Sequence, residues 1–127
     1  MKIIEVISKS DIKRFHQLPH MIYANDGNWI PHIKQEVEAV FDHKKNKYFK
    51  HGTATRFILK DKKGNTIGRV AAFIDEKRSH TFKKPTGGMG FFECINDQEA
   101  AFKLFDACKE WLSKKGMEAM DGPINFG

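Results

Sequence analysis

Residues 87–120 read GGMGFFECINDQEAAFKLFDACKEWLSKKGMEAM, and this stretch decides the fold class of the chain. It begins with a glycine-rich, apolar run over 87–95 that is typical of a buried strand. An apolar stripe at helical spacing follows, formed by Ala101, Leu104, Phe105, Cys108, Trp111 and Leu112. Residues 117–120 predict a second strand. Two strands joined by a helix of this length imply parallel pairing through a right-handed crossover.

The ends of this helix carry their own signals. We expect Asn96 to cap its N-terminus, with Glu99 three positions later as the reciprocal partner of a capping box. Gly116 follows two lysines and is typical of a helix C-terminus, because glycine adopts the left-handed conformation at low cost. Gly122 and Pro123 close the last strand, since proline cannot donate a hydrogen bond to a sheet ladder.

The chain before this stretch predicts a further strand, two helices and a hairpin. Residues 2–8 predict a strand. The apolar spacing over 8–23 and 31–41 predicts helices, and Pro19 is expected to split or kink the first because proline lacks an N–H. Residues 53–60 and 67–75 are rich in β-branched and aromatic side chains and flank the turn sequence DKKGN, which predicts an antiparallel hairpin.

The composition of the chain limits which classes of protein it can belong to. The chain has 127 residues, of which 40% are hydrophobic, and a formal net charge of +6. These values suit one compact domain and argue against a disordered chain. No apolar run reaches about 18 residues, so no membrane span is expected. Cys94 and Cys108 form no disulfide framework or zinc motif, and free thiols suit a reducing cytoplasm.

The predicted fold class is α/β, of the α+β kind with a mixed sheet, in the order β-α-α-β-β-β-α-β. A single domain is expected over 1–127. The last predicted strand would form an open sheet edge, which proteins usually protect. We therefore expect a domain that is incomplete at its C-terminus.

Several motifs resemble the first two-thirds of the GNAT acyl-CoA N-acyltransferase fold, and more narrowly a group of bacterial GNAT-like proteins of unknown function. They are IGRVAA at 67–72, GFFE at 90–93, and Gly-Pro-x-Asn at 122–125, together with the Asn28-Trp29-Ile30-Pro31 element and the order of strands and helices. The resemblance implies a GNAT-like domain that lacks the C-terminal helix and strands of the complete fold.

The resemblance also implies an activity, which is acyl transfer from acetyl-CoA or another acyl-CoA to the amine of a small molecule or peptide. In GNAT enzymes two parallel strands splay apart, and the freed backbone of the first binds the pantetheine arm and the acyl carbonyl. Matching positions for cofactor binding are Phe92, Cys94 and Asn96, with the divergent partner at 121–123. Glu93 matches the catalytic base. The residues alone leave open an ion pair or a loop cap for Glu93.

One GNAT motif has no match in this sequence. The pyrophosphate-binding turn has the pattern Gln/Arg-x-x-Gly-x-Gly/Ala, whereas residues 95–100 read INDQEA, without arginine or glycine. Asp97 and Glu99 place negative charge where helix N-terminal amides would bind phosphate. The mismatch leaves open a domain that keeps the fold without acyl-CoA binding or activity.

Other functions are also compatible with the sequence. The exposed last strand could pair with a second copy, which would make the domain a non-catalytic binding or oligomerisation module. Lys44, Lys45, Lys47 and Lys50, with Tyr48 and Phe49, have the composition of a single-stranded nucleic-acid site, although a solvated loop is the expected structure and no nucleic acid is expected as a partner. His16 and His20 are four residues apart without a third ligand, so no metal site is predicted.

Overall fold

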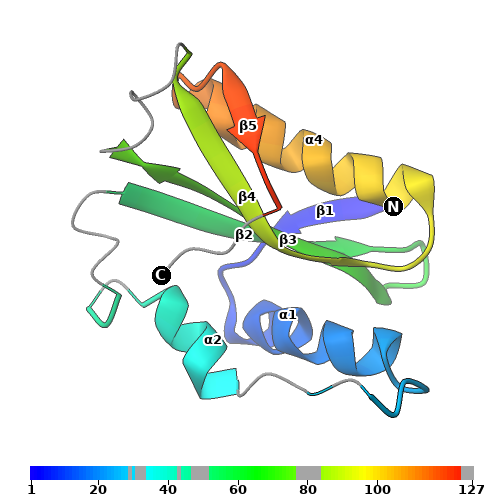
Figure 1. Cartoon of the computed structure of the whole chain (residues 1–127). Coiled ribbons are helices and arrows are strands. Elements are labelled where there is room, and N and C mark those ends of the chain that lie inside the picture. Colours follow the sequence, from blue (N-terminus) through cyan, green and yellow to red (C-terminus); the bar gives the residue numbers. More distant parts are fainter. Residues whose placement is uncertain (29, 31–33, 43, 47–51, 77–83, 124–127) are drawn as a thin grey trace.

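The computed structural model describes residues 1–28, 30, 34–42, 44–46, 52–76 and 84–123. Its elements are β1 (Lys2–Glu5), α1 (Lys9–Ile22), α2 (Lys34–Val40), β2 (Gly52–Lys60), β3 (Thr66–Asp75), β4 (Thr86–Cys94), α4 (Gln98–Lys114) and β5 (Ala119–Asp121). In Figure 1 the sheet lies between α4 on one face and α1 and α2 on the other. The predicted α+β class with a mixed sheet is confirmed.

The strands lie in the sheet in sequence order, β1-β2-β3-β4-β5. Neighbours pair antiparallel up to β4, and β4 and β5 pair parallel. The predicted hairpin is therefore β2 and β3, and the predicted parallel crossover runs through α4. Among the described residues, no helix has the length and apolar character needed to cross a membrane.

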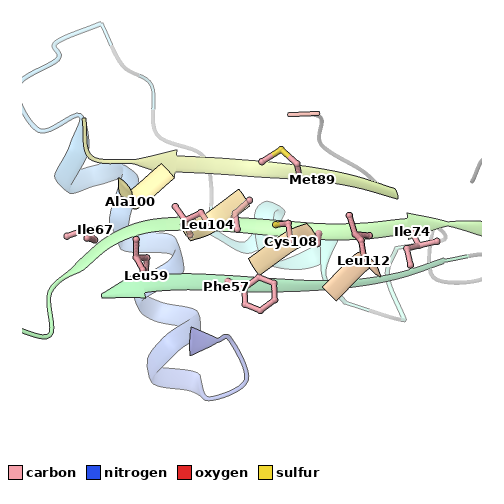
Figure 2. Close-up of a cluster of buried hydrophobic side chains, with 11 residues drawn as sticks. Phe57, Leu59, Ile67, Ile74, Met89, Ala100, Leu104, Cys108 and Leu112 are labelled. Carbon is pink, nitrogen blue, oxygen red and sulfur yellow. The ribbon is translucent and has the colours of Figure 1, made fainter. Parts of the chain in front are cut away.

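The main core fills the space between the sheet and α4 (Figure 2). Its buried members are Phe57, Leu59, Ile67, Val70, Ala72, Ile74, Met89, Ala100, Leu104, Cys108 and Leu112. Two glycines allow α4 to approach the sheet closely. A Cβ atom on Gly68 would lie 2.5 Å from Leu104 Cδ1, and one on Gly87 would lie 2.4 Å from Leu112 Cδ2. Each buried leucine stabilises the fold by roughly 2 kcal/mol.

The opposite face of the sheet combines apolar packing with buried charge. Phe15 and Val37 from the two helices pack there against Ile58 of β2. Arg56 and Arg69 lie on the same face and are only 7% and 4% exposed. Buried guanidinium groups are costly unless they are hydrogen-bonded, so this face must supply acceptors to both arginines.

α1 is one continuous helix, so the expected break at Pro19 is absent. Ser8 caps it, because its side-chain oxygen accepts a hydrogen bond from the Asp11 N–H at 3.1 Å. Pro19 lies buried within the helix and cannot donate to the carbonyl oxygen of Phe15. Arg69 Nη1 donates to that oxygen instead, at 2.9 Å. A side chain from β3 thus replaces the missing helical hydrogen bond.

Other predicted element ends shift by a few residues. α4 is capped by Asp97 rather than Asn96, because the Asp97 carboxylate accepts from the Ala100 N–H at 3.2 Å. Asn and Asp are equally good caps, so the sequence did not separate these neighbours. Gly116 ends the helix with φ +86, as predicted. β1 stops at Glu5, and the expected start of the second helix at 31–33 lies outside the described residues.

Candidate functional site

The central feature of the site is a bulge in β4. Arg69 pairs with Glu93 and Ala71 pairs with Gly90, so Phe91 and Phe92 together face the single residue Val70. Phe91 has φ 53, a conformation that is rare for a residue with a side chain. A bulge of this kind leaves an extra residue outside the ladder and bends the strand. Backbone groups of β4 are therefore freed from regular pairing at this point.

The two phenylalanines of the bulge anchor it on opposite faces of the sheet. The Phe91 ring lies 5.3 Å from the Phe41 ring, on the side of α1 and α2. The Phe92 ring stacks at 4.9 Å on Phe105 of α4. Aromatic contacts of this geometry stabilise by about 1 kcal/mol beyond the burial of area, so both anchors oppose straightening of β4.

The pairing between β4 and β5 is short. Their parallel ladder covers only Thr86–Gly88 of β4 opposite Ala119–Asp121 of β5, and no further pairing between them occurs in the described part of the chain. Gly122 lies against the next β4 residue, since a Cβ atom there would be 2.5 Å from the Met89 carbonyl oxygen. β5 thus ends where the chain still contacts Met89, and the divergence that the sequence predicts around 121–123 stays a prediction.

A groove of about 740 Å³ follows the C-terminal end of β4 to the start of α4. Phe92, Cys94 and Asn96, the three predicted cofactor-binding residues, all line it, together with Met21, Ile95 and Asp97. Met21 and Ile95 are 61% and 40% exposed, so part of the rim is apolar. Burial, followed by the charge of Asp97, raises the pKa of Cys94, so this thiol stays protonated at neutral pH and is not an activated nucleophile.

Glu93, the predicted catalytic base, lies on the other face of β4 and is half-buried. Its Oε2 accepts a hydrogen bond from the Tyr23 hydroxyl at 2.7 Å. The hydrogen bond to Glu93, followed by burial, raises the pKa of Tyr23, so the phenol keeps its proton and acts as a donor. Glu93 forms no close ion pair with a lysine or arginine among the described residues.

Arg69 is hydrogen-bonded to both the β4 bulge and α1. Its Nε donates to the main-chain oxygen of Phe91 at 3.1 Å, and its Nη1 donates to Phe15. Burial lowers the pKa of Arg69 to about 10, and the nearby Glu93 charge opposes that shift, so the group stays cationic at neutral pH. One side chain therefore fixes both the bulge and α1.

Sequence reasoning placed Glu93 and the groove residues but not Tyr23 or Arg69. Tyr23 was only the expected end of a helix, and 70 residues separate it from Glu93. Arg69 lay in a predicted strand without any sign that it would be buried. The predicted lysine loop cannot be placed, because residues 47–51 lie outside the described residues.

Two curated proteins share sequence with this chain, whereas no protein-family model matches it. The "Bacterial ceramide synthase" of Caulobacter vibrioides is 33% identical over 131 residues, which cover 99% of this chain and 33% of that protein. "Protein YghO" of Escherichia coli is 31% identical over 120 residues, covering 94% of this chain and 30% of that protein. The chain thus spans about a third of the length of these relatives.

Solved structures of acetyltransferases resemble the chain over 98% of its length. The aminoglycoside acetyltransferase meta-AAC0020 from a soil metagenome superposes with a TM-score of 0.65 at 16% identity, over 77% of its own chain. AAC(6')-Iy, bound to a CoA-containing bisubstrate analogue, superposes at 0.62 with 14% identity, over 79% of its chain. The chain has the GNAT fold. At these identities the likeness establishes the fold alone, and a CoA-type ligand is known in that fold from the bisubstrate complex.

The first turn of α4 is acidic. The Asp97 carboxylate accepts a hydrogen bond from the Ala100 N–H, and Glu99 lies in the first turn of the helix. One N–H of the helix end is therefore bound by an acid of the same turn, which offers no cationic partner to a diphosphate. The start of α4 therefore does not fit the diphosphate of an acyl-CoA.

Proposed function

We propose that this domain carries out acyl transfer from an acyl-CoA thioester to an amine. The Phe91 bulge in β4, which follows the end of the β4–β5 ladder, is the observation that carries the proposal. The bulge frees main-chain groups beside which an acyl thioester would lie, and Phe92 of the bulge also lines the groove. The pantetheine arm, an extended chain of amides, would bind there by hydrogen bonds to the freed backbone.

In this proposal Glu93 is the catalytic base. The amine nitrogen attacks the thioester carbonyl carbon, a C–N bond forms, and the C–S bond breaks. The ammonium proton passes to the Glu93 carboxylate, directly or through a water, and the departing thiolate takes a proton from solvent. Tyr23 acts as a positioning residue, because its hydroxyl fixes one carboxylate oxygen and leaves the other for the proton.

The proposed substrates are a fatty acyl-CoA and an amine that itself carries an apolar chain. The Caulobacter relative is named for ceramide synthesis, and a ceramide is a fatty amide. The exposed apolar side chains at this end of the molecule support the same choice. Met21 and Ile95 line the groove, and Phe102, in the first turns of α4, is 54% exposed. Apolar surface gathered at one place is typical of a binding site.

The test is a direct assay of amide formation by mass spectrometry, with fatty acyl-CoA donors and long-chain amino alcohols as acceptors. We expect product with the wild-type chain and at least a ~100-fold loss with Glu93→Gln, which keeps the shape of the side chain but cannot accept the proton. Glu110→Gln, on the exposed surface near the C-terminal end of α4, is the matched control and should retain activity. Activity that survives in Glu93→Gln, or no product with any donor, would contradict the proposal.

A further inference from the structure

A second cavity lies on the other side of Arg69, away from the groove. It has a volume of about 180 Å³ and is formed between α1 and the start of α2. Its described polar lining consists of Lys13, His16, Gln17, His20, Lys34 and Arg69, and no aspartate or glutamate is among these described residues. Acyl transfer at Glu93 uses none of these side chains for its chemistry.

The charge balance around this cavity is positive. Three cations line it, Lys13, Lys34 and Arg69, and Glu38 contacts its lining residue His16. Both oxygens of Glu38 are bound by Arg56, at 2.7 and 2.8 Å, and one of them also meets His16 at 2.7 Å. Glu93 accepts its hydrogen bond from Tyr23.

Arg69 is the least compensated of the cations. Its side chain is almost completely buried, and its hydrogen bonds go to two main-chain oxygens, those of Phe91 and Phe15. No carboxylate lies within ion-pair distance of it in the described part of the chain. The Glu93 charge compensates Arg69 only from beyond ion-pair distance, and an anion in the adjoining cavity would supply a closer counterion.

We propose that this cavity binds a phosphate group, as the free ion or as a phosphate monoester. The combination of a buried arginine with two flexible lysines suits a compact group that carries up to two negative charges and several acceptor oxygens. The cavity has room for a phosphate. Lys13 and Lys34 are exposed at its mouth and reach it from different helices, so the ligand would also connect α1 to α2.

The site is independent of the acyl-transfer proposal, and its test requires no turnover. Inorganic phosphate is titrated into the chain by isothermal titration calorimetry at constant ionic strength, with sodium chloride as the blank. We expect saturable binding at one site, and at least a tenfold weaker affinity in the Lys13→Gln/Lys34→Gln double variant. Both lysines are exposed, so the variant should fold normally. Lys62→Gln/Lys63→Gln, in the exposed β2–β3 turn, removes the same charge and should bind like wild type.

The source of the phosphate is distinguished in a second arm. Vesicles that contain phosphatidic acid are compared with vesicles of neutral lipid. If the wild type is retained on the phosphatidic acid vesicles and the double variant is not, the site binds a lipid headgroup. If only soluble phosphate binds, the site takes a free phosphate. Equal affinity in the double variant and the wild type, or a heat signal that chloride reproduces, would overturn the proposal, whatever the outcome of the acyl-transfer assay.

Discussion

Glu38 of α2 accepts two parallel hydrogen bonds from Arg56 of β2, from Nη1 to Oε1 at 2.7 Å and from Nη2 to Oε2 at 2.8 Å. The Arg56 guanidinium also lies 4.2 Å above the centre of the Phe41 ring. α2 has only seven residues and contributes Val37 as its buried residue. This short helix is therefore held to the sheet largely by one charged pair, and it in turn covers the wall of the cavity beside Arg69.

Removing the charge of Glu38 should loosen α2. We expect Glu38→Gln to lower the free energy of unfolding by about 1 kcal/mol, because Arg56 is left buried without its counterion while Gln keeps one acceptor. The figure is small because the Glu38 side chain is 37% exposed. Urea denaturation measures it. Glu110→Gln removes an exposed pair with Lys114 and should change stability far less, so equal losses in both variants would count against the pairing.

The same cluster makes stability depend on pH. Burial lowers the pKa of His16 below 6.5, despite its contact with Glu38. Burial alone would raise the pKa of Glu38, but hydrogen bonds from Arg56 and His16 bring it below 4.5. Both groups bind protons more readily when unfolded, so stability should fall as the pH drops from about 6.5, and further below 4.5. Urea titrations from pH 8 to pH 4 measure this. If the free energy of unfolding of His16→Gln depends on pH above pH 5 as it does in the wild type, His16 does not contribute to the pH dependence of stability.

The contact between Gly68 and Leu104 predicts coupling between the sheet and α4. A Cβ atom at Gly68 would meet Leu104 Cδ1 at 2.5 Å, in a part of the core that is fully buried. We expect Gly68→Ala to cost about 1–3 kcal/mol by overpacking, and Leu104→Ala about 2–5 kcal/mol by leaving a cavity. The double variant should cost less than the sum, since shortening Leu104 removes the clash. Additive losses in thermal unfolding would contradict this packing.

Asp97 should limit the affinity for acyl-CoA. Its carboxylate caps α4 at the place where a diphosphate would lie, so we expect Asp97→Asn to tighten acyl-CoA binding by roughly three- to tenfold through loss of charge repulsion. Asn is an equally good cap, so α4 should remain intact. Acyl-pantetheine, which has no diphosphate, should bind both proteins equally. Asp106→Asn, exposed further along the same helix, is the control, and the same gain there would point to a general charge effect.

Much of the fold could be predicted because its signals are local. The stripe from Ala101 to Leu112 has helical spacing, and the strands of the hairpin flank a turn whose residues favour reversal. The split considered at Pro19 does not occur, for a reason that lies far along the chain. Only the folded structure brings Arg69 to the Phe15 carbonyl, where it compensates for the missing N–H. The cap at Asp97 was missed by a single residue, because its neighbour Asn96 caps equally well.

The candidate site was predictable only in part, for the same reason. Glu93 and the groove residues lie in one contiguous run, so a family resemblance could place them. Tyr23 meets Glu93 across 70 residues, and that contact depends on how α1 packs against the sheet. The bulge at Phe91 could not be predicted from the sequence, because a positive φ is rarely adopted by phenylalanine.

The central claim is that an acyl-CoA binds where β4 leaves β5, and chemical-shift mapping of the labelled chain tests it most directly. Amide resonances are followed by NMR while a non-hydrolysable acyl-CoA analogue is added. We predict saturable shifts at residues 90–96 and 120–122, with little change in the β2–β3 turn at 61–65. Shifts that avoid residues 90–96, or the absence of any saturable change, would contradict the account.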